Sequence, residues 1–257
     1  MSDADIEIWN LYMLDPSVSH WTCSVPKSGG DDTDYEDAAS IAVRNWPVRA
    51  AVADGATESV YAGLWADMLV DTLVEVGPDP EAMGAAIQAR QSELSTAVQE
   101  RAAEQPWYVQ AKAEEGAFAT GLVLSVRGDG TWAAASIGDC CLFRLRGETV
   151  HAWPTDDPEA YTNRPALIPS RGADRIPAPD TTTGRWTSGD SFLLATDAVA
   201  AWLLRVGPRT GLDADASVEA RIETARADET LRNDDATLLI LKMMDAPEDD
   251  SPSSDRD

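Results

Sequence analysis

The chain has 257 residues, of which 44% are hydrophobic and 25% are charged, and these values are ordinary for a globular protein. It carries 20 Lys and Arg residues against 45 Asp and Glu residues, which gives a formal net charge of -25. A field of this sign repels the phosphate backbone, so nucleic acid is not expected as a partner. Solubility explains the charge as a whole, whereas carboxylates gathered at particular positions would instead bind hard divalent cations.

The sequence also gives no indication of a transmembrane helix, a signal peptide or a zinc site. It contains no apolar run of about 18 residues, so no transmembrane helix is expected. The N-terminal stretch is acidic and lacks the basic and apolar regions of a signal peptide, which makes the cytoplasm the expected location. Cys23, Cys140 and Cys141, with His20 and His151, match none of the usual zinc spacings, so neither a zinc site nor a cysteine–histidine nucleophile is expected.

The first half of the chain predicts two strands followed by two long helices. The strands cover 38–43 and 48–54 and are joined at a turn that contains Pro47. A helix over 59–76 is capped by Thr57 or Ser59 and ends at Gly77 and Pro78. Its apolar residues at helical spacing are Val60, Leu64, Met68, Leu69, Leu73 and Val76. The second helix runs over about 80–106, with Pro80 at an early position and Pro106 at its end.

The second half returns to strands. Segments 117–126, 131–139 and 141–147 read as a run of hairpins around a Gly-Asp-Gly turn at 128–130, and 151–189 reads as irregular with short strands. A buried strand at 190–197 leads into a short helix at 198–206, a polar helix covers about 215–231, and the last strand is 236–244. Strands in runs with helix pairs between them indicate an α+β fold. Residues 1–245 are expected to form one domain, followed by an acidic, disordered tail at 246–257.

Acidic residues recur where these strands begin or end. They are Asp54, Asp139 and Asp197 after strands, and Glu36 with Asp37 and Asp234 with Asp235 before strands. Ends of different strands can converge at one edge of a sheet stack. Carboxylates without imidazole or thiolate suit Mg²⁺ or Mn²⁺, and two such ions about 4 Å apart would clamp a phosphoryl group. The alternative for any one of these residues is a helix cap or turn, and Asp54, which precedes a helix, fits that role well.

Five short motifs resemble those of the metal-dependent type 2C serine/threonine protein phosphatases, in the same order along residues 34–242. They are "YEDA", "VADG", "ASIGDC", "LLATDA" and "NDDATLLIL". The resemblance implies a four-layer α-β-β-α sandwich with two central antiparallel sheets. It also implies a dinuclear Mn²⁺ or Mg²⁺ centre between the sheets.

The resemblance assigns a role to each acidic position. Asp54 would bridge the two metal ions, and the Gly55 carbonyl would bind one of them. Asp197 and Asp234 would complete the shell of the other ion. These three aspartates are therefore the expected catalytic residues.

Three further residues would support the metal centre. Glu36 and Asp37 would act through bound waters, and Asp139 would join Asp197 at a third, weaker ion found in many family members. A metal-bound water would attack the phosphorus directly. The implied function is a phosphoserine/phosphothreonine phosphatase that acts on a phosphoprotein substrate or signalling partner.

The sequence also departs from the family pattern. Asp32 stands where the family often places a phosphate-binding arginine, so weaker binding of phosphorylated substrate is expected. The Asp-Gly motif continues as Ala56-Thr57-Glu58, without the usual glycines or histidine. The four arginines considered as substitutes are each read as surface cations: Arg44, Arg164, Arg171 and Arg232. These departures favour an alternative function, in which a catalytically weak or inactive phosphatase fold serves as a binding or regulatory module.

Overall fold

The structure is a computed structural model, and it describes residues 18–29, 35–56, 61–102, 116–161, 164–172, 175–212 and 217–244. Several expected features lie outside these residues, namely Asp32, the Thr57 or Ser59 cap, Pro106 and the tail at 246–257. The division into one domain at 1–245 and a tail stays a prediction. No helix among the described residues is long and apolar enough to cross a membrane.

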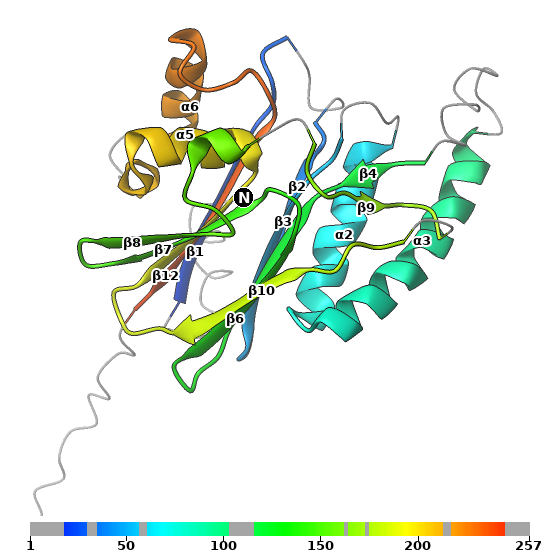
Figure 1. Cartoon of the computed structure of the whole chain (residues 1–257), viewed down its shortest axis with the longest axis horizontal. Coiled ribbons are helices and arrows are strands. Elements are labelled where there is room, and N and C mark those ends of the chain that lie inside the picture. Colours follow the sequence, from blue (N-terminus) through cyan, green and yellow to red (C-terminus); the bar gives the residue numbers. More distant parts are fainter. Residues whose placement is uncertain are drawn as a thin grey trace, which may run out of the picture.

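Two five-stranded antiparallel sheets form the centre of the molecule (Figure 1). The first sheet has the order β1 (Val18–Val25), β12 (Ala236–Met243), β11 (Ser191–Ala195), β7 (Cys141–Arg146) and β8 (Thr149–Trp153). The second has the order β10 (Asp180–Arg185), β6 (Thr131–Ile137), β5 (Gly121–Val126), β3 (Val48–Asp54) and β2 (Asp37–Ala42). A small ladder joins β4 (Phe118–Ala119) to β9 (Ile168–Pro169).

The helices lie on the outer faces of the two sheets. Helices α2 (Ala62–Val76) and α3 (Pro80–Ala102) cover the second sheet, and α5 (Asp197–Val206) and α6 (Val218–Ala227) cover the first (Figure 1). Two short 3₁₀ helices flank α5, namely η1 (Pro158–Ala160) and η2 (Pro208–Gly211). Helix α2 ends as expected at Gly77, whose N–H donates to the Leu73 carbonyl and whose φ of 77° suits glycine.

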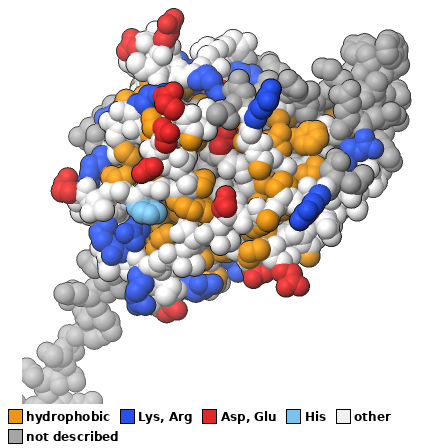
Figure 2. All heavy atoms as spheres, viewed as in Figure 1, with side chains coloured by type: hydrophobic (Ala, Val, Ile, Leu, Met, Phe, Trp, Pro, Cys, Tyr) orange, Lys and Arg blue, Asp and Glu red, His pale blue; other side chains and the backbone are white. Residues whose placement is uncertain are grey.

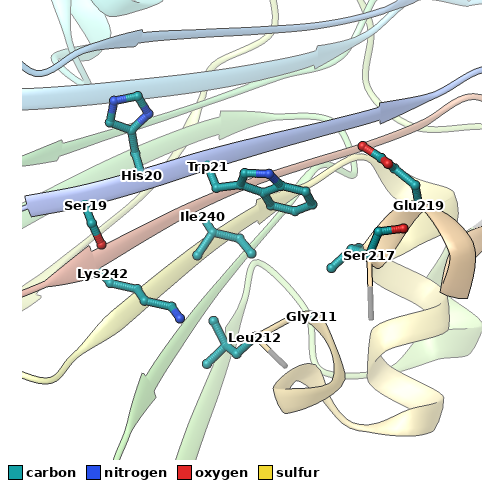
Figure 3. Close-up of a pocket in the computed structure, with 10 residues that line it drawn as sticks. Ser19, His20, Trp21, Gly211, Leu212, Ser217, Glu219, Ile240 and Lys242 are labelled. Atoms are coloured by element: carbon teal, nitrogen blue, oxygen red, sulfur yellow. The ribbon is translucent and has the colours of Figure 1, made fainter. Parts of the chain in front are cut away.

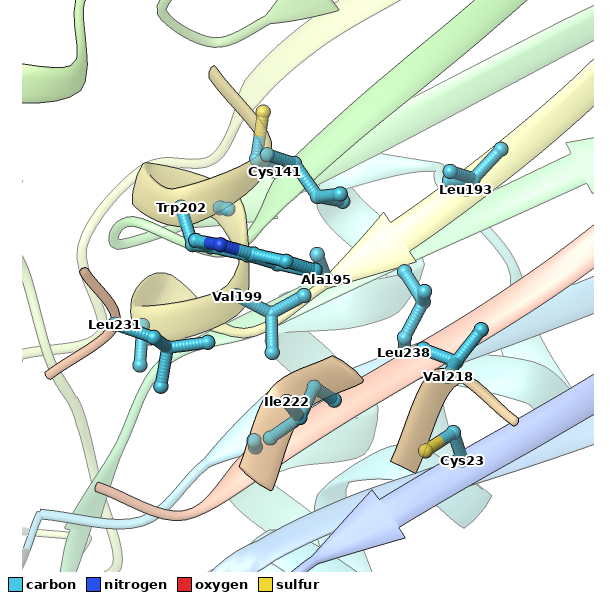
Figure 4. Packing of buried hydrophobic residues seen from close by; sticks show 14 of the residues in the cluster. Cys23, Cys141, Leu193, Ala195, Val199, Trp202, Val218, Ile222, Leu231 and Leu238 are labelled. Atoms are coloured by element: carbon cyan, nitrogen blue, oxygen red, sulfur yellow. The ribbon is translucent and has the colours of Figure 1, made fainter. Parts of the chain in front are cut away.

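Three separate hydrophobic clusters show that these elements form four layers. The middle cluster fills the space between the sheets with side chains from both, such as Val52 and Leu124 from one and Leu194 and Leu239 from the other. A second cluster joins α2 and α3 to the second sheet, and a third joins α5 and α6 to the first sheet (Figure 4). The expected four-layer α-β-β-α sandwich is therefore confirmed.

The side-chain pattern of α2 shows why its buried face was predicted only in part. Leu69 and Leu73 are buried as expected, but Leu64 and Met68 are only partly buried, and Trp65 lies at the centre of the face. The Trp65 indole donates to the Ile168 carbonyl at 3.0 Å. The helix packs against both the sheet and α3, so its buried face is wider than a single apolar stripe.

One expectation about the strands is wrong, and one strand was not predicted. Strand β1 was not predicted, because it is an edge strand in which polar and exposed residues interrupt the apolar alternation. Strands β6 and β7 do not form a hairpin, since the chain crosses between them from one sheet to the other. Strand β8 pairs with β7 instead, and it overlaps the start of the region at 151–189 that was expected to be irregular with short strands. Tertiary packing decides which sheet a strand joins, so local sequence does not reveal it.

The surface has no single acidic face in the view of Figure 2. Acidic and basic side chains are interspersed there, and apolar side chains are exposed between them. The three cysteines are free and buried, as expected for small apolar side chains.

Candidate metal centre

The ends of several strands bring five aspartates together. Asp37 opens β2 and Asp54 closes β3, and the two residues face each other in the register of that strand pair. Asp197 follows β11 and is the first residue of α5. Asp234 lies just before β12, the strand that pairs with β11. Asp139 lies where the chain crosses from β6 to β7. We call these residues the carboxylate cluster: Asp37, Asp54, Asp139, Asp197 and Asp234.

The pKa of Asp54 shows that the cluster shares one electrostatic environment. Burial raises this pKa well above its usual range, and the charges of the other four cluster members raise it further. The charges of all four other members therefore act on Asp54. A carboxylate in such surroundings favours a bound proton or a neighbouring cation.

Gly55 holds Asp54 close to the neighbouring segments. Its N–H donates to the Glu36 carbonyl at 3.1 Å, and the Thr120 N–H donates to the Asp54 carbonyl at 2.8 Å. A Cβ atom at Gly55 would lie 2.7 Å from the Glu36 carbonyl oxygen and 2.9 Å from that of Ala62. Both neighbours are backbone atoms, so only glycine fits here without moving the chain.

Asp37 is buried and hydrogen-bonded. The Thr196 hydroxyl donates to Asp37 Oδ2 at 2.8 Å, which ties β2 to the residue before α5. Burial raises the pKa of Asp37 to about 8, and the charges of Asp235 and Asp197 add to the rise, while the Thr196 hydrogen bond opposes it. Thr196 thus supports the ionised form of a carboxylate that its surroundings would otherwise neutralise.

Asp139 has a buried oxygen with no partner. Its Oδ1 atom accepts no hydrogen bond within the described part of the chain. Burial raises the pKa of Asp139 to about 7, with a further contribution from the charge of Asp197. A buried carboxylate oxygen without a donor is costly to leave unpaired, so this atom is available to a cation.

Arg232 joins two members of the cluster. Its Nη2 atom lies 2.5 Å from Asp197 Oδ2 and 2.7 Å from Asp234 Oδ2. Burial raises the pKa of Asp197, and the Arg232 charge opposes this rise. Arg232 is exposed, as expected, but its guanidinium group also pairs directly with the cluster, which the sequence did not predict.

A second set of polar contacts fixes the position of Glu36. Asp235 accepts from the Lys27 N–H at 2.8 Å and from the Glu36 N–H at 2.9 Å. The Lys27 ammonium lies 3.0 Å from Glu36 Oε2 and 3.8 Å from Asp235 Oδ2. Glu36 thus directly precedes the cluster residue Asp37 in the sequence, and its carboxylate forms an ion pair with Lys27.

Sequence reasoning missed the roles of Lys27, Thr196 and Asp235, and it missed the pairing of Arg232 with Asp197 and Asp234. Thr196 and Asp235 were noticed only as departures from a motif, whereas both make hydrogen bonds that position the acidic strand ends. The location of Arg232, two residues before Asp234, was the available signal. Lys27 gave no signal, because its contacts with Asp235 span 208 residues.

The donor set of the cluster suits Mg²⁺ or Mn²⁺. It contains only carboxylate oxygens, two of its residues (Asp37 and Asp197) are buried and the other three are partly buried, and it includes the unpaired Oδ1 atom of Asp139. In their present conformations, no three or more His, Cys, Asp or Glu side chains of the described residues are arranged to hold a metal ion. Two of the cluster carboxylates are turned toward Arg232 and one toward Thr196. The residues fit a divalent cation by type and burial, provided that these side chains turn.

A pocket of about 370 Å³ lies elsewhere, between β1, β12, η2 and α6. Figure 3 shows Trp21, Ile240 and Leu212 around it, with Lys242 at one end and Glu219 at the other. None of its lining residues belongs to the carboxylate cluster. The candidate metal centre and this pocket are therefore separate features.

A family model described as protein phosphatase 2C matches residues 30–239. A search with the sequence among curated proteins gave no match.

Three solved structures illustrate the similarity of fold. The catalytic domain of the serine threonine protein phosphatase PstP, in complex with two manganese ions, has a TM-score of 0.61 at 17% identity, over 89% of this chain and 99% of that one. Serine/threonine phosphatase Stp1 from Staphylococcus aureus has a TM-score of 0.63 at 15% identity, over 91% and 98%. PppA, a regulatory component of T6SS in Pseudomonas aeruginosa, has a TM-score of 0.57 at 19% identity, over 89% and 98%.

Proposed function

Because this chain belongs to the protein phosphatase 2C family, we propose that it is a metal-dependent phosphatase that hydrolyses phosphoserine or phosphothreonine in proteins. The observation that carries this proposal is the carboxylate cluster, in which the charges of four aspartates raise the pKa of a fifth, Asp54. So many acidic groups repel one another unless cations lie between them. The cytoplasm remains the proposed location, and a phosphoprotein the proposed partner.

The proposed metal ligands are those expected from the sequence. Asp54 and the Gly55 carbonyl would serve one Mn²⁺ or Mg²⁺ ion. Asp54, Asp197 and Asp234 would serve a second, and Asp139 with Asp197 a third. Asp37 and Glu36 would act through water. When bound, such ions supply Lewis acidity to the phosphoryl oxygens and activate the attacking water.

The residues of the chain itself would fix the geometry of this centre. Asp54 closes β3 and Asp197 opens α5, so both are held by regular elements and not by free loops. The Thr196 hydroxyl donates to Asp37, and Asp235 accepts from the backbone of Lys27 and Glu36. These hydrogen bonds span more than 150 residues and would keep the two sheets in register at the site.

The alternative is a regulatory or binding module that turns over poorly. Arg232 favours this alternative, because its guanidinium group is paired with Asp197 and Asp234, two carboxylates that catalysis would need. PppA, which has a similar fold, is described as a regulatory component. The two functions share the same fold and differ in whether phosphate is released.

The test is phosphate release from a phosphothreonine peptide at millimolar Mn²⁺, with p-nitrophenyl phosphate as a second substrate. We expect turnover that requires Mn²⁺ and stops when EDTA is added. The control variant is Asp129→Asn, since Asp129 lies in the turn between β5 and β6, at the far end of these strands from Asp54. No release above the EDTA background would reject the enzyme and favour the regulatory module.

A further inference from the structure

One nitrogen atom of Arg232 stands between two carboxylates of the cluster. Its Nη2 atom contacts both Asp197 Oδ2, at 2.5 Å, and Asp234 Oδ2, at 2.7 Å. These oxygens belong to different elements, because Asp197 opens α5 and Asp234 precedes β12. A single positive group therefore bridges two strand ends, which is the task proposed above for a divalent ion.

The loop that carries Arg232 is fixed on both sides. Leu231 is buried in the cluster of apolar residues beneath α5 and α6 (Figure 4). The Arg226 guanidinium group donates to the Asp234 carbonyl and to the carbonyls of Val25 and Pro26. Asp235 accepts from the backbone N–H groups of Lys27 and Glu36. The backbone thus presents Arg232 to the cluster, and only its side chain is free to move.

We propose that Arg232 is a built-in cation that occupies the position between Asp197 and Asp234 and competes with a divalent ion for these two carboxylates. The inference rests on the proposed function, because it concerns the same metal centre. It adds a property of this chain: loading the centre requires the Arg232 side chain to leave. That side chain is 46% exposed, so it has open solvent to move into.

The physical reason for competition is charge. An arginine side chain stays protonated in proteins, so it cannot become neutral when a metal ion arrives. A guanidinium group and a divalent ion on the same pair of oxygens would repel each other across a few ångströms, in a partly buried site. Arg232 therefore stabilises the metal-free protein and lowers its affinity for the ion.

The experiment is calorimetric titration of Mn²⁺ into the wild type, Arg232→Gln and Arg232→Lys. Glutamine removes the charge but keeps a polar side chain, and lysine keeps the charge. The matched control is Arg205→Gln, which removes one positive charge from an exposed pair with Glu159. We expect Arg232→Gln to bind Mn²⁺ about tenfold more tightly than the wild type. Arg205→Gln and Arg232→Lys should stay within about threefold of it.

Thermal unfolding supplies a readout that does not depend on turnover. Arg232→Gln should unfold at a lower temperature than the wild type without metal, and Mn²⁺ should raise its unfolding temperature by more than it raises that of the wild type. Equal or weaker Mn²⁺ affinity in Arg232→Gln would overturn the inference and leave the proposed function standing. Equal affinity with a raised KM for phosphopeptide would assign Arg232 to the substrate phosphate instead. Absence of Mn²⁺ binding in both proteins would reject the metal centre itself.

Discussion

Asp54→Asn is expected to lower kcat/KM for a phosphothreonine peptide by at least about 100-fold, because loss of even an outer contact at a metal site costs 10- to 100-fold. The charges of all four other members of the cluster act on Asp54, and Asp54 is the residue that we propose to bridge the two ions. Asparagine keeps the size of the side chain and removes its charge. The measurement is phosphate release over a range of Mn²⁺ concentrations.

The fold should survive this substitution. Burial and the charges of its neighbours raise the pKa of Asp54 and so disfavour its ionised form, which means that removing this charge should cost the metal-free protein little stability. Asp54→Asn should therefore unfold at the same temperature as the metal-free wild type or higher, while Mn²⁺ no longer stabilises it. Asp129→Asn should match the wild type in both respects. Wild-type activity in Asp54→Asn at the same Mn²⁺ concentration would show that the cluster is not the catalytic site.

Gly55→Ala is expected to destabilise the protein by about 1–3 kcal/mol, as overpacking of a filled site does. The added Cβ would lie 2.7 Å from the Glu36 carbonyl oxygen and 2.8 Å from the Ala62 carbonyl carbon, and neither backbone can move without shifting β2 or α2. For a chain of this size the loss corresponds to a fall in Tm of roughly 2–4 °C per kcal/mol. Activity should fall as well, since Asp54 is the adjacent residue.

The matched control for this variant is Gly84→Ala. Gly84 lies within α3, and a Cβ atom added there meets no other atom within 4 Å. Alanine should raise the stability of that helix by up to about 1 kcal/mol and leave activity unchanged. A Gly55→Ala protein as stable and active as Gly84→Ala would contradict the close approach that we describe at Gly55.

Local features of the sequence predicted an α+β fold and the main acidic strand ends, and the resemblance of the motifs to a known family implied the four layers. Asp54 and Asp197 each follow an apolar strand directly, and their order along the chain matches the family motifs. The turn at Pro47 and the end of α2 at Gly77 were likewise set by one or two residues. Such features can be recognised in the sequence without knowing which segments contact one another in the folded protein.

The features that could not be predicted depend on contacts between distant segments. Arg232 reads as a surface cation until α5 brings Asp197 against it, 35 residues away in the sequence. The pairing of Lys27 with Asp235 joins the two ends of the chain, and nothing in either segment specifies its partner. Strand β1 depends on the same distant pairing, since its neighbour in the sheet is β12. Secondary-structure propensity and hydrophobic periodicity describe neighbouring residues only, so they do not predict contacts between segments this far apart in the sequence.

Anomalous diffraction from crystals grown with Mn²⁺ tests the central claim most directly, because it locates the ions without reference to activity. We predict Mn²⁺ peaks within the carboxylate cluster, with Asp54 in contact with two of them and Arg232 turned away from Asp197 and Asp234. Peaks elsewhere on the protein, or no peak near Asp54 at millimolar Mn²⁺, would contradict the proposed metal centre.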